Sequence, residues 1–297
     1  MNLFRGLVAF PITPADEAGR VDTDALRRLL RRLVEAGVPS IGLLGSTGIY
    51  AYLDRTERRR AIEAAVDEVA GRVPLLVGIG ALRTDEAIRL GEDARGCGAA
   101  GVLLAPVSYT PLTAEEVAAH FVAVAEAVRL PLCIYDNPGT TRFSFEAGLV
   151  GRLSRAPGIV AIKTPAPLPR LVAGNLHALR AAAPSGFSVG YSVDWQATAA
   201  LRAGGDAWYS VAGGLFPRSC VAIVEAVAQG DAARSAEAEG RMQPLWDLFT
   251  EFSSLRVMYA CANHLGLCRS QPPLPIRPLP DTARKRIADT LGRLDLD

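Results

Sequence analysis

The chain has 297 residues, 49% of them hydrophobic and 21% charged, so it can bury a sizeable core and is too apolar for a disordered chain. Its 32 basic and 31 acidic side chains nearly cancel, which argues against nucleic acid or an anionic membrane surface as the main partner. No run of about 18 apolar residues predicts a transmembrane helix. Residues 1–14 are typical of a first strand and not of a signal peptide.

The thiols and imidazoles indicate a reducing compartment and no metal site. The five cysteines are odd in number, and no two are spaced as Cys-x-x-Cys. With no export signal, we expect reduced thiols and a cytoplasmic protein. None of the three histidines lies at a metal-ligand spacing from another histidine, a cysteine or an acid, so we expect no metal site built by the protein.

Short apolar runs alternate with amphipathic stretches along the chain. The eight runs cover residues 6–10, 40–45, 74–79, 100–105, 131–135, 159–163, 187–190 and 207–212. Helical periodicity is clear at 22–36, 56–70 and 113–128, and Thr113 with Glu116 predicts a capping box. Eight such units in a row favour a parallel (β/α)8 barrel, an α/β fold. The first strand is not followed by Gly-x-Gly-x-x-Gly, which weakens the alternative of a dinucleotide-binding sheet.

The remaining residues predict helices without further strands. These helices lie near 218–229, 232–249, 251–266 and 281–291. We therefore expect residues 1–215 to form the barrel that carries the active site. Residues 216–297 are expected to form a C-terminal helical extension packed on the barrel.

The ends of the strands are the places to look for chemistry, because barrel active sites lie at the C-terminal ends of the strands. Several side chains and turns that suit catalysis or substrate binding follow the predicted strands. They are Ser46 and Thr47, Tyr109, Tyr135, Lys163, Gly190 and Ala212. We expect Gly190 and Ala212 to contact the substrate.

Lys163 is the most informative of these residues. The chain has 32 basic residues but only two lysines, Lys163 and Lys285. Lys163 ends an apolar strand, and burial disfavours the charged ammonium form, which leaves more of the neutral amine that attacks a carbonyl. A neutral lysine can form a Schiff base, which an arginine cannot. The alternative is a structural lysine whose amine reaches water or pairs with an acid.

The other polar candidates each have a functional and a structural interpretation. Backbone N–H groups in the glycine-flanked turn at Ser46 and Thr47 can bind a carboxylate, and the two hydroxyls can relay protons. Tyr135 can carry protons to and from a substrate oxygen, or it can pack at the edge of the core with a wet hydroxyl. Tyr109 lies on a loop, where it can line the mouth, meet another subunit or simply face solvent.

Taken together, these segments resemble the dihydrodipicolinate synthase / N-acetylneuraminate lyase family. The likeness covers nearly the whole chain, and the order and spacing of the segments carry it. They are the opening strand at 6–14, the Gly-Ser-Thr-Gly turn at 45–48, Tyr-Asp-Asn-Pro at 135–138, Ala-Ile-Lys at 161–163, and the tail at 255–267 and 274–279.

The resemblance implies a (β/α)8 barrel with a C-terminal helical extension, usually a homotetramer, so we expect a dimer or tetramer. It implies a lysine imine to pyruvate or a related 2-oxo acid, without a metal or organic cofactor. By match, Lys163 is the Schiff-base lysine and Tyr135 the proton-shuttling phenol. Ser46 and Thr47 match the pair that binds the carboxylate of the 2-oxo acid and relays protons. The family has a second tyrosine, which enters the active site from a neighbouring subunit. Tyr109, or in its place Ser108, matches that tyrosine.

Three positions depart from the family pattern. Ile49 stands where the family commonly has glutamate, and Asp136 where it commonly has asparagine. Thr140 stands where dihydrodipicolinate synthases carry an arginine that binds the carboxylate of their second substrate, aspartate semialdehyde. We expect Thr140, Asn137 and an ionised Asp136 facing the pocket to suit hydroxyl groups better than an anion. Arg142 is the residue that would replace the missing guanidinium.

Three hypotheses remain. The first is a Schiff-base-forming lyase, an aldolase or dehydratase, that acts on pyruvate or a 2-oxo-3-deoxy sugar acid. The second is a 4-hydroxy-tetrahydrodipicolinate synthase with an atypical pocket. The third is a barrel that binds a 2-oxo acid without turnover, against which Lys163 and Tyr135 together argue. Release of pyruvate or loss of water from a panel of sugar acids distinguishes an enzyme from a sensor.

Overall fold

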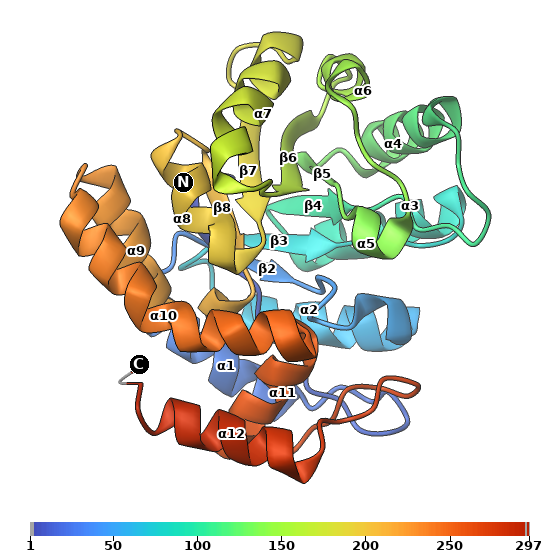
Figure 1. Cartoon of the computed structure of the whole chain (residues 1–297). Helices are drawn as coiled ribbons and strands as arrows, with labels where there is room; N and C mark the ends of the chain where they lie inside the picture. The colour runs from blue at the N-terminus through green and yellow to red at the C-terminus, as the bar shows by residue number, and fades with distance from the viewer. Residues whose placement is uncertain (1–2, 295, 297) are drawn as a thin grey trace.

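Eight parallel strands pair in chain order, and the last pairs back with the first, so the sheet closes into a barrel in the computed structural model (Figure 1). The structure describes residues 3–294 and 296. The strands are β1 (Gly6–Ala9), β2 (Ser40–Leu43), β3 (Leu75–Gly78), β4 (Gly101–Leu104), β5 (Leu132–Tyr135), β6 (Ile159–Pro165), β7 (Ser188–Ser192) and β8 (Ala207–Ser210). Each begins within one residue of an apolar run predicted from the sequence.

Helices follow the strands and cover the outside of the barrel. They are α1 (Thr23–Glu35), η1 (Tyr50–Tyr52), α2 (Arg55–Val69), α3 (Thr84–Cys97), α4 (Ala114–Val128), α5 (Pro138–Thr141), α6 (Ala147–Leu153), α7 (Pro169–Ala182), α8 (Asp194–Arg202), η2 (Ala212–Gly214), α9 (Pro217–Ala228), α10 (Ala232–Phe252), α11 (Ser254–His264) and α12 (Asp281–Leu291). The predicted capping box is present: the N–H of Thr113 donates to Glu116, whose own N–H donates to Thr113 Oγ1. The predicted (β/α)8 barrel with C-terminal helices is confirmed.

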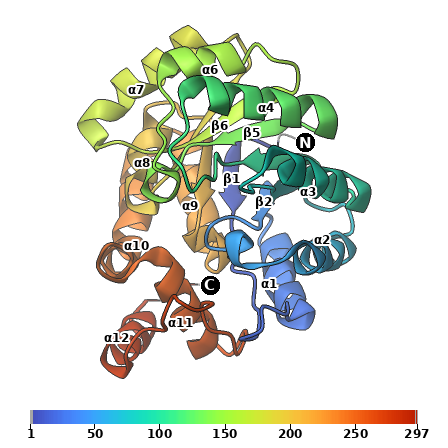
Figure 2. The ribbon, with the colours of Figure 1, turned by 90° about the vertical axis from the view of Figure 1, so that its right-hand side faces the viewer.

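The C-terminal helices gather on one side of the barrel. Figures 1 and 2 show α10, α11 and α12 together, at the opposite end of each view from α4, α6 and α7. Tyr259 on α11 donates a hydrogen bond of 3.0 Å to the carbonyl of Thr13, beyond the end of β1. This bond fastens the extension to the loop that follows the first strand. No helix in the described part of the chain is long and apolar enough to cross a membrane.

The division between barrel and extension stays a proposal. α9 follows β8 as the earlier helices follow their own strands, and its residues Cys220 and Ile223 are fully buried. The division at residue 215 would separate this helix from the strand that it follows.

The register of three neighbouring strands brings the strongest candidates to one level. Lys163 on β6 is paired with Tyr135 on β5 and with Gly190 on β7. Since side chains alternate between the two faces of a strand, residues at one level in parallel strands project to the same face. Tyr135 packs inside the barrel with Phe10 and Tyr209. The interior therefore ends, near its C-terminal mouth, in aromatic rings around Lys163.

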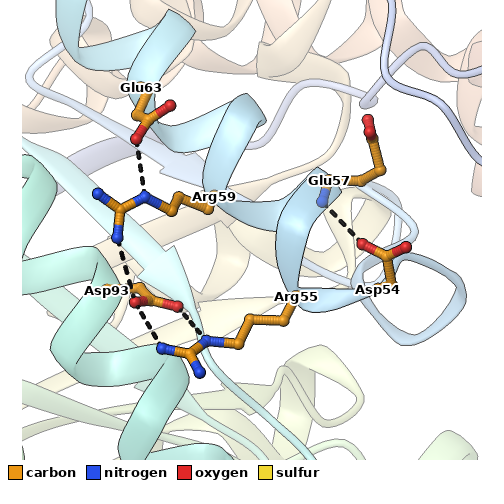
Figure 3. A network of polar contacts seen from close by, with 6 residues as sticks. All are labelled: Asp54, Arg55, Glu57, Arg59, Glu63 and Asp93. Atoms are coloured by element: carbon orange, nitrogen blue, oxygen red, sulfur yellow. Dashed lines mark hydrogen bonds and ion pairs between the residues drawn. The ribbon is translucent and has the colours of Figure 1, made fainter.

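A polar network holds the helix that follows the Ser46–Thr47 turn (Figure 3). Asp54 caps α2 by accepting the N–H of Glu57 at 2.8 Å. Arg55 binds Asp93 on α3 through hydrogen bonds of 2.6 and 2.9 Å, and Arg59 approaches the same carboxylate at 3.4 Å. The hydrogen bond from Arg55 keeps the pKa of Asp93 below its usual value. These contacts join α2 to α3 outside β2 and β3.

Close backbone packing between β2 and β3 generates a stability prediction. A Cβ atom on Gly78 would lie 1.9 Å from the carbonyl oxygen of Leu44, whereas a Cβ atom on the exposed helical Gly96 would meet nothing within 4 Å. We expect Gly78→Ala to lower the free energy of unfolding by roughly 1–3 kcal/mol, because backbone must move. Gly96→Ala, the control, should raise it by roughly 0.5–1 kcal/mol. Urea denaturation checks both values, and equal stabilities for the two variants would contradict the expectation.

Candidate active site

Lys163 lies in an aromatic pocket at the mouth of the barrel. The side chain is 4% exposed, and its Nζ atom lies 4.0 Å from the centre of the Phe10 ring, 4.2 Å from that of Tyr135 and 5.9 Å from that of Tyr209. Among the residues that the structure describes, no carboxylate oxygen lies within ion-pair distance of this nitrogen. The amine is thus not held in a salt bridge, and the structural alternative of an acid-paired lysine is wrong.

The Phe10 ring reaches this position because two glycines make room for it. A Cβ atom on Gly42 would lie 2.2 Å from Phe10 Cζ, and one on Gly45 would lie 2.6 Å from Phe10 Cδ1. Aromatic faces attract a cation, and the effect grows where water is excluded. The pocket can therefore accommodate the positive charge of an ammonium or iminium nitrogen without a carboxylate. Sequence reasoning missed Phe10, which lies five strands away from Lys163 in chain order.

Tyr135 is the centre of a short hydrogen-bond chain. Its hydroxyl lies 3.1 Å from Ser46 Oγ and accepts a hydrogen bond of 2.9 Å from the side-chain amide of Asn137. The structure thus brings Lys163, Tyr135 and Ser46 together from β6, β5 and the turn after β2, as predicted. Asn137 was missed as a partner of the phenol, because the sequence signals only that it belongs to a turn.

The turn that carries Ser46 and Thr47 is tightly wound. The N–H of Ile49 donates to the carbonyl of Ser46 at 3.1 Å, and Ile49 itself has φ of 53°. A Cβ atom on Gly48 would lie 3.1 Å from both Gly45 N and Thr13 Oγ1, so a larger residue here would have to displace its neighbours. Thr47 is buried and Ser46 half-buried. The turn therefore presents Ser46 to Tyr135 on a backbone with little freedom to move.

Gly190 and Ala212 lie at the mouth, but their contacts in the structure are with other protein groups. A Cβ atom on Gly190 would lie 2.4 Å from Tyr209 Cε2, so glycine leaves room for that ring. The N–H of Ala212 donates to Asp194 Oδ2 at 2.9 Å, and so is already used. Their proposed contact with substrate stays a prediction, and for Ala212 it would be made by atoms other than the N–H.

Asp194 is a buried acid that sequence reasoning missed. Its carboxylate accepts hydrogen bonds from Trp208 Nε1 at 2.8 Å and from the N–H groups of Val211 and Ala212. Burial raises the pKa of Asp194 above its usual value, against these hydrogen bonds. The carboxylate joins the start of α8 to the loop after β8. The signal was present in the sequence as an acid at the start of a helix.

The expectation that Asp136 faces the pocket is wrong. Asp136 follows Tyr135 on an extended backbone, so its side chain points to the opposite face, away from the barrel interior. There Asp136 Oδ2 accepts a hydrogen bond of 2.8 Å from Thr164 Oγ1. Oδ1 is buried and makes no hydrogen bond of good geometry within the described chain, and burial raises the pKa of this carboxyl, although Thr164 and the N–H of Phe145 act to lower it. Asp136 therefore does not shape the charge of the pocket by direct contact.

Thr140, Arg142 and Tyr109 lie on exposed turns. Thr140 Oγ1 donates to the carbonyl of Asn137 at 3.2 Å, and Arg142 ends α5 with φ of 56°. Tyr109 is 97% exposed, and Ser108 beside it donates to the carbonyl of Thr110. Within one chain, the structure does not bring Tyr109 to Lys163 and Tyr135. No cluster of metal-ligating side chains is found in the described residues.

Because the Asp136 carboxyl is buried, we predict that replacing it with an amide increases the stability of the fold in a pH-dependent way. A raised native pKa means that this group stabilises the fold below its unfolded pKa of about 3.9, and that this stability is lost as pH rises through the native pKa. We expect Asp136→Asn to raise the free energy of unfolding by roughly 1–3 kcal/mol at neutral to alkaline pH and to have little effect below about pH 4. Denaturation at several pH values measures the difference.

Asp194→Asn serves as the contrasting variant, because the Asp194 carboxylate accepts several hydrogen bonds. An amide nitrogen there would face N–H donors, so this variant should be destabilised at neutral pH. A gain for Asp136→Asn that did not change with pH would contradict the assignment.

Comparison with known proteins identifies the family of this barrel. A model of the dihydrodipicolinate synthetase family matches residues 3–294. The 4-hydroxy-tetrahydrodipicolinate synthase of Methylococcus capsulatus is 34% identical over 97% of this chain and 98% of its own length. That of Thiobacillus denitrificans is 36% identical over 93% and 92%.

Solved structures agree in fold over almost the full length. A dihydrodipicolinate synthase from Agrobacterium tumefaciens superposes with a TM-score of 0.96 and 54% identity, covering 98% of each chain. One from Aquifex aeolicus superposes with a TM-score of 0.89 and 27% identity, covering 99% of each. These matches confirm the resemblance noted from the sequence and the predicted enzyme class. The chain belongs to the dihydrodipicolinate synthetase family and is a Schiff-base-forming lyase.

Proposed function

We propose that Lys163 forms an imine with the C2 carbonyl of pyruvate or a 2-oxo-3-deoxy sugar acid, and that the chain is an aldolase or dehydratase. The observation that carries the proposal is the position of Nζ. It lies free of carboxylates in an aromatic pocket, beside a phenol that is hydrogen-bonded to Ser46. A buried amine next to a proton carrier is the arrangement that imine formation requires.

Each residue has a role in this proposal. The neutral Lys163 amine attacks the C2 carbonyl and gives a carbinolamine. Tyr135 donates its proton to the leaving hydroxyl, water departs, and the nitrogen lone pair completes the C=N bond. The N–H groups and hydroxyls of Ser46 and Thr47 bind the carboxylate of the 2-oxo acid. The imine then serves as the electron sink for bond cleavage, bond formation or loss of water, so no metal or organic cofactor is needed.

The second part of the substrate is the point on which the alternatives differ. The relatives compared above are named as synthases, which supports the synthase reaction. A second carboxylate is held best by a planar bidentate cation, and Thr140 offers only a hydroxyl where synthases carry arginine. We therefore favour a 2-oxo acid substrate whose tail is neutral or hydroxylated. Arg142, exposed on the same turn, is the residue that would restore the synthase reaction.

We propose further that the protein is a homo-oligomer, a dimer or tetramer. Tyr109 is 97% exposed and Leu82 is 65% exposed, and they follow neighbouring strands β4 and β3. The two loops touch near their bases, where a Cβ atom on Gly80 would lie 3.2 Å from Val107 Cγ2. Two large apolar side chains on adjoining loops suit contact with a second copy better than contact with water. In that assembly Tyr109 would enter the partner's site.

A cytoplasmic location is also proposed. None of the five cysteines forms a disulfide within the described residues, and four of them are buried. Free thiols persist in a reducing compartment.

The imine itself is the first expected outcome. Incubation with pyruvate and borohydride should add a reduced adduct at Lys163 and none at Lys285, as read by peptide mass spectrometry. Lys163→Arg should abolish the adduct, because a guanidinium is not a nucleophile at neutral pH. The second lysine provides an internal control in the same digest. An adduct confined to Lys285, or none with any 2-oxo acid, would disprove the mechanism.

The second expected outcome concerns substrate choice. We expect a higher kcat/KM for cleavage or dehydration of 2-oxo-3-deoxy sugar acids than for condensation of pyruvate with aspartate semialdehyde. The reason is that a site without a paired cation discriminates against a buried second anion. Both reactions should be measured on one preparation, with Arg142→Ala alongside. Efficient condensation that Arg142→Ala abolishes would establish the synthase reaction instead.

The third expected outcome is a loss of assembly. Tyr109→Asp places a charge in the proposed contact and should lower the mass found by analytical ultracentrifugation. Leu265→Glu is the control, because Leu265 is an exposed apolar residue at the end of α11, in the C-terminal helices, and not on the loops that follow β3 and β4. A wild-type protein that sediments as a monomer at micromolar concentration would refute the proposal.

A further inference from the structure

We infer that Asn137 is a positioning residue for the proton carrier: its side-chain amide fixes the direction of the Tyr135 proton and favours the phenolate. This inference rests on the proposed function of Tyr135. Asn137 Nδ2 lies 2.9 Å from Tyr135 Oη, and Ser46 Oγ lies 3.1 Å from the same atom. The phenol oxygen therefore has two hydrogen-bond neighbours.

The chemistry of the two neighbours sets the proton direction. An amide nitrogen only donates, so Tyr135 Oη accepts from Asn137. The phenol proton must then point elsewhere, and Ser46 Oγ is the acceptor at hand. In the resting site the chain thus runs from Asn137 to Tyr135 to Ser46. Tyr135 is held with its proton directed along the chain that leads to the carboxylate-binding turn.

Asn137 is held in place by its own backbone. Its carbonyl accepts hydrogen bonds from the N–H groups of Thr140 and Thr141, both at 3.0 Å, and from their hydroxyls at 3.2 and 3.0 Å. Pro138 follows at the first position of α5. The Asn137 carbonyl accepts the first hydrogen bonds of α5, and the Asn137 side chain makes no capping hydrogen bond. The side-chain amide is therefore available for Tyr135. A donor fixed in this way loses little freedom when the phenol ionises.

The amide acts at the step in which the phenol loses its proton. When the carbinolamine C–O bond breaks, the Tyr135 O–H bond breaks with it, water leaves, and an iminium cation and a phenolate anion form together. A hydrogen bond donated to an anion is stronger than one donated to a neutral group, so Asn137 stabilises the phenolate more than the phenol. Ser46 can rotate its hydroxyl to donate as well. Asn137 therefore lowers the barrier through its hydrogen bond to Tyr135.

The charged and titratable groups around Tyr135 are few. Lys163 Nζ lies over its ring from β6 at 4.2 Å, and Tyr50 on η1 interacts with it electrostatically. Tyr209 from β8 and Cys133 from β5 share the buried cluster inside the barrel with Tyr135. All four groups remain in place when Asn137 is changed. A shift of the pH profile in an Asn137 variant therefore reports the lost donor.

Asn137→Leu is the principal test, because it keeps the approximate volume and removes the donor. We expect kcat to fall about 10- to 100-fold and the pH profile of kcat to differ from that of the wild type, because the donor to the phenolate is gone. Asn137→Asp keeps the size but offers an acceptor, so it should lose more activity at neutral pH and regain part of it on acidification. Tyr135→Phe sets the scale of complete loss, roughly 10²–10⁴-fold.

A matched control exists in the same fold. Tyr191 Oη donates to Asn175 Oδ1 at 2.9 Å on the outer side of the barrel, so Asn175→Leu removes a tyrosine–asparagine bond that plays no part in the chemistry. This variant should keep the wild-type kcat and pH profile. Circular dichroism and melting temperature establish that each variant is folded, and Asn137→Asp keeps the test open if Asn137→Leu is not.

The borohydride adduct separates the two levels of the proposal. If wild-type protein forms no adduct at Lys163, the proposed function fails. If wild type forms the adduct but Asn137→Leu keeps its kcat and pH profile, the role of Asn137 alone is overturned. An equal shift in Asn175→Leu would also overturn it, since the effect would then be structural. A shift confined to the Asn137 variants confirms the inference.

Discussion

The pairing of β6 with its two neighbours is the constraint on which the site depends. It sets Lys163 level with Tyr135 on one side and Gly190 on the other, inside a barrel that closes in chain order. A slip of one residue would turn the Lys163 side chain to the outer face. The closure of the sheet, in which β6 pairs with a neighbour on each side, opposes that slip. The position of the reactive amine is therefore a property of the whole barrel.

The sequence predicted the position of the reactive side chains where that position follows from the pattern of apolar strands. Buried parallel strands have continuous apolar runs, and these located all eight strands to within two residues of their ends. It was misleading for Asp136, because adjacency in the chain implied that this acid shares the pocket with Tyr135. Alternation along β5 sends the two side chains to opposite faces. Contacts such as Phe10 with Lys163 depend on the curvature of the closed sheet, which no local pattern encodes.

The mouth of the barrel concentrates conformations and buried groups that would be costly elsewhere. Leu44, Ile49 and Val193 have φ of 56°, 53° and 72°, in a region that branched side chains seldom adopt. Asp194 is buried beside Val193, and Thr13 Oγ1 lies buried without a hydrogen-bond partner within the described chain. Such features persist only where the surrounding structure enforces them. The strands supply that enforcement, and the loops at the mouth hold the strain.

The fit between Phe10 and Gly42 constrains how this site can diverge. With Phe10 present, any side chain at position 42 would collide with the ring, since the added Cβ would lie 2.2 Å from Cζ. A smaller residue at position 10 would leave a cavity, costly but without a collision. Exchange of the pair is therefore less costly with position 10 first, because the reverse order must displace a packed ring. Positions 10 and 42, which line the pocket beside the reactive amine, are therefore expected to change together, with position 10 changing first.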